Sequence, residues 1–180
     1  IDTAKEIEHF QSVGVQCREI LIELGNHIYE PTMAGADEQP QASNFKRKSE
    51  LFIHFYLTGS ENADYRSIIK KLTESTWEYT NKITHSSSAT YYEASTCVML
   101  CISLVGVYEN IIQKVYDLIS KYKCSVCKSK KLTIDSDDSD ENGIVQKLYL
   151  KCEECSAITA VIFENSGTEN PTYIRGKIVE

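Results

Sequence analysis

The sequence lacks any run of about 18 consecutive apolar residues, the length that a membrane-spanning helix needs. Its longest apolar stretch, Cys97 to Val107, is interrupted by Ser103 and Gly106, so we expect no membrane span. An excess of basic residues is also lacking, because 26 Asp and Glu outnumber 19 Lys and Arg and give a net charge of −7. That balance argues against broad, nonspecific nucleic-acid binding but leaves room for a local basic patch. No signal peptide or internal repeat is evident, and since residue 1 is Ile, we expect a processed chain or a piece of a longer protein.

Four of the seven cysteines form two Cys-x-x-Cys pairs near the end of the chain, Cys124 with Cys127 and Cys152 with Cys155. Two such pairs supply four thiolates, which can close a tetrahedral shell around one Zn²⁺ ion. No position would stay open for water, so the pattern predicts one structural zinc per chain rather than a catalytic metal. The alternatives are four unrelated thiols, or two disulfides in a secreted domain.

The three remaining cysteines are Cys17, Cys97 and Cys101, and they lie in apolar, helical surroundings. Unpaired thiols argue for a reducing compartment, so we expect a cytoplasmic protein.

Apolar residues recur at helical spacing along the first 120 residues. They predict helices over residues 3–29, 44–57 and 64–82, and a fourth whose apolar stripe runs from residue 91 to 119. The expected apolar face of the third helix is Ile68, Ile69, Leu72, Trp77 and Ile83. Long helices joined by short loops favour an antiparallel bundle.

After Lys121 the pattern changes to short strands around the cysteine pairs, expected at residues 132–134, 144–150 and 157–163. The acidic stretch between the first two is expected to be a hairpin loop from Asp135 to Gly143. The predicted fold is therefore mainly α: a helical bundle over residues 1–120, followed by a small β-rich zinc ribbon over residues 121–180.

Candidate chemistry lies where the third helix ends, in Trp77-Glu-Tyr-Thr-Asn-Lys-Ile-Thr-His85. This segment resembles the motif of the HEPN superfamily, helical-bundle proteins of which many are RNases in toxin–antitoxin and antiviral systems. The family motif is an Arg, commonly followed by Asn, then a few residues and a His. Asn81 and His85 match the Asn and the His, whereas Thr80 stands where the Arg would be.

The resemblance implies that His85 and Asn81 are the candidate catalytic residues and that the bundle forms a homodimer that brings two motifs together. In active members the His is thought to act in acid–base catalysis on the RNA 2′-hydroxyl, and the Arg to steady the phosphate. A missing cationic donor costs several kcal/mol of transition-state stabilisation, so we lean against catalysis. The structural alternative is that both residues cap the third helix and bond the next loop.

Two weaker candidates lie elsewhere. Arg47 and His54 also have the Arg-to-His spacing, but the aromatic neighbours of His54 favour a core or interface histidine. Five lysines surround the first cysteine pair and form the best nucleic-acid footprint, with solvation of the surface as the alternative. They are Lys121, Lys123, Lys128, Lys130 and Lys131.

Three hypotheses follow from these patterns. The first is a noncatalytic or degenerate HEPN-like binding or assembly module with structural zinc, with RNA or protein as partner. The resemblance alone assigns this module to a prokaryotic defence or toxin-type system. The second is a metal-independent endoribonuclease that uses His85, and the third is a nucleic-acid-binding zinc-ribbon adaptor.

Overall fold

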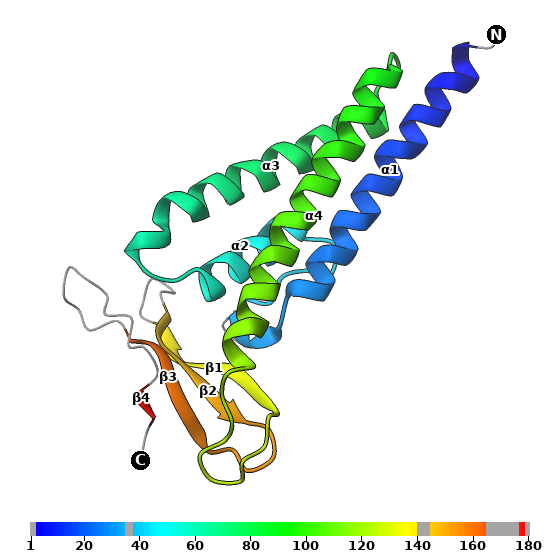
Figure 1. Cartoon of the computed structure of the whole chain (residues 1–180). Helices are drawn as coiled ribbons and strands as arrows, with labels where there is room; N and C mark the ends of the chain where they lie inside the picture. The colour runs from blue at the N-terminus through cyan, green and yellow to red at the C-terminus, as the bar shows by residue number, and fades with distance from the viewer. Residues whose placement is uncertain (1–2, 35–37, 140–144, 165–176, 179–180) are drawn as a thin grey trace. The chain divides into compact units, whose positions relative to one another are not determined.

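The computed structural model of the protein describes residues 3–34, 38–139, 145–164 and 177–178 (Figure 1). Within these residues the chain forms four α-helices, two single-turn 3₁₀ helices and one antiparallel sheet. The fold class, mainly α with a small C-terminal β region, is confirmed. The helices are α1 (Thr3–Ile28), α2 (Phe45–Tyr56), α3 (Ala63–His85) and α4 (Tyr91–Ile119). The 3₁₀ helices are Pro31–Met33 and Ser60–Asn62, and the strands are β1 (Leu132–Ser139), β2 (Val145–Cys152), β3 (Ile158–Glu164) and β4 (Lys177–Ile178).

The chain folds as two compact units. The helical unit comprises residues 1–52 and 65–110, and therefore holds α1 with most of α2, α3 and α4. The ribbon unit comprises residues 53–64 and 111–180, including the last turns of α4 and the whole sheet.

Within the helical unit, α3 and α4 run in opposite directions, whereas α1 runs in the same direction as α4 (Figure 1). The ring of Phe52 on α2 lies 5.5 Å from that of Tyr108 on α4. In the core, the Tyr108 hydroxyl forms a hydrogen bond with the Thr73 hydroxyl at 3.0 Å. The largest side chains that this unit buries almost completely are Leu21, Phe45, Phe52, Ile69, Ile83, Leu104 and Tyr108.

The turn between α3 and α4 is set by a reciprocal cap. The Glu93 N–H donates to the Thr90 hydroxyl at 3.3 Å, and the Thr90 N–H donates to the Glu93 carboxylate at 3.1 Å. This Thr-x-x-Glu arrangement satisfies two backbone donors that a helix start would leave unpaired, so α4 begins sharply at Tyr91.

The structure corrects two expectations for α3. The helix continues to His85, so this histidine lies in the last helical turn rather than in the loop after it. The buried face is also different, because Ile68 is 62% exposed while three threonines are buried in its place. The buried residues of α3 are Ile69, Thr73, Thr76, Thr80 and Ile83. Threonine is small enough for close helix packing, but it is not an apolar residue, so a search for apolar residues at helical spacing does not detect it.

α4 is apolar on its exposed side as well as on its buried side. By length and composition, its segment Tyr91–Asp117 is long and apolar enough to cross a membrane, with a mean hydropathy of 1.6. Of that apolar window, 28% is buried. The same helix supplies Cys97, Leu104 and Tyr108 to the core, so part of its hydropathy has a packing role. The absence of a membrane span stays a prediction.

In the ribbon unit the strands pair in sequence order, β1-β2-β3-β4, all antiparallel. β1 continues to Ser139, so the prediction that the acidic loop begins at Asp135 is wrong. The strand is stabilised across the sheet, since Asp135 forms an ion pair with Lys151 of β2 at 3.0 Å. Residues 140–144, the rest of that loop, lie outside the described residues.

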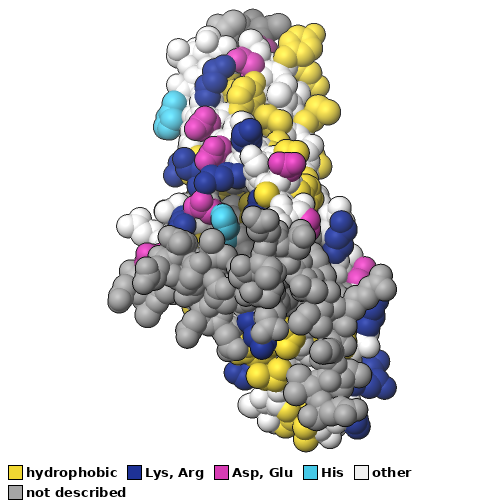
Figure 2. Space-filling view, turned by 90° about the vertical axis from the view of Figure 1, so that its left-hand side faces the viewer, with side chains coloured by type: hydrophobic (Ala, Val, Ile, Leu, Met, Phe, Trp, Pro, Cys, Tyr) yellow, Lys and Arg dark blue, Asp and Glu magenta, His cyan; other side chains and the backbone are white. Residues whose placement is uncertain are grey.

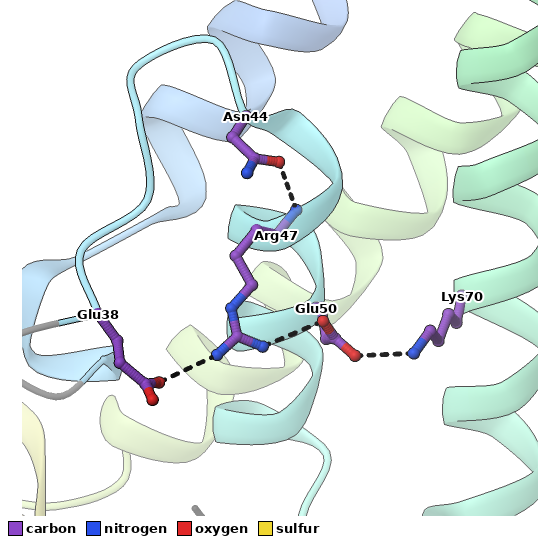
Figure 3. A network of polar contacts seen from close by, with 5 residues as sticks. All are labelled: Glu38, Asn44, Arg47, Glu50 and Lys70. Atoms are coloured by element: carbon purple, nitrogen blue, oxygen red, sulfur yellow. Dashed lines mark hydrogen bonds and ion pairs between the residues drawn. The ribbon is translucent and has the colours of Figure 1, made fainter.

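A network of charged side chains joins α2 to its neighbours in the helical unit (Figure 3). Arg47 forms ion pairs with Glu38 at 3.3 Å and with Glu50 at 3.1 Å. Glu50 forms a further ion pair with Lys70 of α3 at 2.7 Å. The Lys70 hydrogen bond, aided by Arg47, outweighs partial burial and lowers the pKa of Glu50. Asn44 caps the start of α2 by accepting the Arg47 backbone N–H at 3.2 Å.

We expect Glu50→Gln to lower the unfolding free energy of the helical unit by about 1 kcal/mol at pH 7. Because the folded-state pKa of Glu50 lies below its unfolded value, this contribution is present above the unfolded pKa and is lost as pH falls through the folded one. The difference between the two proteins should therefore shrink as the pH falls below the unfolded-state pKa of the carboxyl group. Urea unfolding followed by fluorescence of Trp77, the single tryptophan, measures it. A difference that persists at low pH would contradict the charge-based account.

Candidate metal centre

The four paired cysteines converge on one point of the ribbon unit. Their sulfur atoms all lie within 4.8 Å of one another. Cys124 and Cys155 are separated by 3.5 Å between sulfurs, as are Cys127 and Cys152. A tetrahedral ion with four bonds of about 2.3 Å needs sulfur separations of about 3.8 Å. The four side chains therefore fit a single metal ion, and all are free thiols rather than disulfides.

The two cysteine pairs share one backbone geometry. In each, the N–H of the residue after the second cysteine bonds the carbonyl of the first: Lys128 to Cys124 at 3.1 Å and Ser156 to Cys152 at 2.9 Å. Those same residues, Lys128 and Ser156, have left-handed backbones, with φ of 60° and 57°. The N–H of the first cysteine bonds the carbonyl five residues on, Cys124 to Ser129 and Cys152 to Ala157. Two superposable turns thus present their thiols to a common centre.

Backbone N–H groups point at the sulfur atoms and favour the thiolate form. The Cys127 N–H lies 3.5 Å from the Cys124 sulfur, and it is the main cause that lowers the pKa of Cys124 to about 6. For Cys127 the Ser129 N–H lowers the pKa, but hydrogen bonding to Cys152 and other thiols prevails and raises it to about 12. Metal ligands bind as thiolates, so an incoming cation displaces the thiol protons that remain.

The ligands are also part of the ribbon core. Cys124 and Cys152 are buried together with Leu132, Leu150 and Ala160. Ile119, Tyr122, Ile134 and Ala157 pack against this cluster. The cluster is small, so an ion bound by the four cysteines would add a crosslink to its apolar packing.

The left-handed residues offer a test of the turn geometry. We expect Lys128→Gly to stabilise the metal-loaded ribbon by about 0.5–1 kcal/mol, because glycine removes the Cβ strain of a positive φ. Lys130→Gly, a change at a neighbouring exposed lysine without that φ, should be neutral or slightly destabilising. Resistance of the ribbon to a graded zinc chelator measures both, and equal effects of the two changes would argue against the turn.

The five lysines proposed as a nucleic-acid footprint are all exposed. Two of them have contacts within the ribbon: Lys131 pairs with Glu154 at 3.2 Å, and the Lys128 ammonium donates to the Ser125 carbonyl at 2.8 Å. Glu154 of the second cysteine pair thus neutralises part of the basic patch.

The HEPN-like residues have individual structural roles. Thr80 is completely buried and donates its hydroxyl to the Trp77 carbonyl at 2.8 Å. The Asn81 amide donates to the same carbonyl at 2.9 Å, while His85 is exposed one turn later. Lys82, a possible substitute cation, pairs with Glu93 at 3.3 Å. The position that corresponds to the family's arginine therefore faces the core.

The second Arg–His candidate, Arg47 with His54, does not lie in the core. Arg47 is bound by two carboxylates, as described above, and His54 is exposed. Of the two expectations for His54, the core position is wrong, because the buried aromatic residues beside it are Phe52 and Phe55, while the interface position stays a prediction.

A second group of potential metal ligands was not identified from the sequence as a site. The sulfur atoms of Cys17, Cys97 and Cys101 also lie within 4.8 Å of one another, in the helical unit. Burial raises the pKa of Cys17 to about 11, whereas the hydrogen bond from Cys101 lowers the pKa of Cys97 to about 7. The spacing of Cys97 and Cys101, one helical turn apart, was the signal available in the sequence.

No family model matches the chain, and no curated protein or solved structure is significantly similar to it.

Proposed function

We propose that this chain is a zinc-stabilised assembly module: a degenerate HEPN-like helical bundle that pairs with a second copy of itself and carries no catalytic activity. The observation that carries the proposal is the outer face of α4, five large apolar residues that are exposed in the single chain. They are Tyr91, Tyr92, Val98, Met99 and Ile102, with exposed fractions of 68%, 80%, 38%, 69% and 67%.

The outer face of α4 is apolar over a long distance. From Ala94 to Tyr108 the helix contains no charged residue and no histidine. Figure 2 shows hydrophobic side chains gathered along one edge of the helical unit, at the upper right of that view. A contiguous apolar face of this kind marks an interaction site. Because the face is uncharged, two copies can meet across a two-fold axis without like-charge repulsion.

Gly106 lies in the same part of α4 and supports close approach by another helix. A glycine in a helix interior costs about 1 kcal/mol relative to alanine. Packing among the described residues does not explain that cost, because a Cβ added at Gly106 would meet none of their atoms within 4 Å. A partner backbone packed at this point would justify it.

Zinc is the metal that the four cysteines favour. An all-thiolate tetrahedral shell selects zinc or an iron–sulfur centre, and the paired-knuckle arrangement is typical of structural zinc ribbons. Cys124, Cys127, Cys152 and Cys155 would hold one ion per chain, and the ion would crosslink the loop before β1 to the turn between β2 and β3. Thiolate ligation and three further free thiols also support a reducing, cytoplasmic location.

The geometry around His85 favours an assembly role over ribonuclease activity. The arginine of the HEPN motif is replaced by a buried threonine, and the amide of Asn81 is engaged with the helix backbone. No phosphate-binding cation is supplied by these positions. The assignment to a prokaryotic defence or toxin-type system rests on the HEPN resemblance alone.

We expect Ile102→Asp to convert the protein from a dimer to a monomer. A carboxylate at the centre of an apolar interface loses hydration without gaining a partner, which costs several kcal/mol per buried charge. Ile68→Asp is the matched control, since Ile68 is also an exposed isoleucine on a helix, at 62%, but lies on α3. Light scattering at tens of micromolar measures the molar mass of each protein.

A wild-type monomer, or equal dimerisation by the Ile102→Asp and Ile68→Asp variants, would overturn the proposed interface. A wild-type protein that binds lipid vesicles instead of forming dimers would show that the outer face of α4 contacts a membrane.

A further inference from the structure

The thiols of the helical unit form a second cluster, separate in sequence and structure from the ribbon cysteines. Cys17 comes from α1, and Cys97 and Cys101 come from successive turns of α4. Their sulfur atoms lie within 4.8 Å of one another, and the three residues are 4%, 0% and 3% exposed. The helix spacing places Cys97 and Cys101 on one face, so both point to the same partner thiol.

We propose that Cys17, Cys97 and Cys101 form a binding site for Cu(I), held by three sulfur atoms in trigonal coordination. Soft thiolate ligands select soft ions such as Cu(I). Three coplanar bonds of about 2.3 Å need sulfur separations of about 4.0 Å. This separation is shorter than the 4.8 Å within which the three sulfur atoms lie.

The number of ligands distinguishes this site from the ribbon centre. Among the described residues, no fourth Cys, His, Asp or Glu contributes a ligand atom to the group. Zinc is almost always four-coordinate in structural sites, so a three-sulfur set leaves it one ligand short. Burial also keeps water from filling a fourth position. Cu(I) is stable with three thiolates, and its binding releases thiol protons to solvent without consuming an oxidant or reductant.

The simpler alternative is that the three cysteines only fill space, because a free cysteine packs as a small apolar residue. Packing alone explains burial, but it does not require three sulfur atoms from two helices to meet at one point. The two explanations differ in a measurable property, the uptake of a thiophilic ion by the folded, zinc-loaded protein.

The test is an anaerobic titration of the zinc-loaded full chain with Cu(I), using bathocuproine disulfonate as the competing chelator. We expect one Cu(I) to bind per chain while zinc is retained. Cys97→Ala should weaken binding by more than about 100-fold, since loss of an outer-shell partner alone costs 10–100-fold. Thr76→Ala, another change at a buried small residue of the helical unit, should leave Cu(I) binding unchanged.

Copper uptake that expels zinc, no uptake, or equal uptake by wild type and Cys97→Ala would each overturn the proposal. Cys17→Ala and Cys101→Ala remove the other two ligands, and should weaken binding equally if Cys97→Ala fails to fold. X-ray absorption at the copper edge of the unmodified protein should show three sulfur neighbours at about 2.3 Å. Four sulfur neighbours would instead place the copper in the ribbon.

Discussion

Removal of the ribbon metal by a chelator is expected to unfold the sheet while the helical unit keeps its structure. The apolar cluster around the cysteines contains five buried residues, and two of them, Cys124 and Cys152, are proposed ligands. Structural zinc binding in small zinc-finger peptides is worth about 10 kcal/mol or more, and such domains are unfolded without the metal. Loss of the ion would remove the crosslink between the loop before β1 and the turn between β2 and β3.

Amide hydrogen exchange measures the loss of structure separately in each segment of the chain. Amides of residues 145–161 should lose protection after chelation, whereas amides around Leu21 and Leu104 should keep it. Trp77 fluorescence should not change, since the single tryptophan lies in the helical unit. Cys152→Ala should reproduce the effect of chelation, and Cys101→Ala should leave zinc content unchanged. A sheet that stays protected without metal would contradict a structural role for the ion.

Thr80→Arg, the change that would complete the HEPN motif, is expected to destabilise the helical unit rather than create a ribonuclease. Thr80 is fully buried on the inner face of α3 and bonds the Trp77 carbonyl. A guanidinium forced into this position is a buried charge without a carboxylate partner, which costs about 3–5 kcal/mol. A large part of the total stability of an ordinary domain would be lost.

Glu78→Arg is the matched control, because it introduces the same side chain at an exposed position of α3. It should change the unfolding free energy by less than about 0.5 kcal/mol. Urea unfolding and an RNA cleavage assay, each made on both variants, separate the two effects. A Thr80→Arg protein that is as stable as wild type and cleaves RNA in a His85-dependent manner would show that position 80 faces the active site.

The sequence was informative where chemistry depends on spacing along the chain. Two Cys-x-x-Cys pairs predicted a common metal centre, and the structure brings all four sulfur atoms together. The presence of α1 and α4 was also predictable, because apolar residues recur at helical spacing along the whole of each helix. The start of α4 had a further local signal, the Thr90-x-x-Glu93 cap, which the apolar pattern does not reveal.

Features that depend on tertiary contacts were not predictable in the same way. The buried face of α3 uses Thr73, Thr76 and Thr80, and composition alone assigns threonine to neither core nor surface. β1 extends past Asp135 where Lys151 of β2 forms an ion pair with that residue, and the sequence of β1 alone does not reveal this contact. The meeting of Cys17 with Cys97 and Cys101 similarly requires the packing of α1 on α4.

Native mass spectrometry of the purified protein tests the central claim most directly, because one spectrum reports both oligomeric state and bound metal. The account predicts a complex with the mass of two chains and two zinc ions, one for each set of four ribbon cysteines. A single chain without metal, under conditions in which the helical unit is folded, would contradict it.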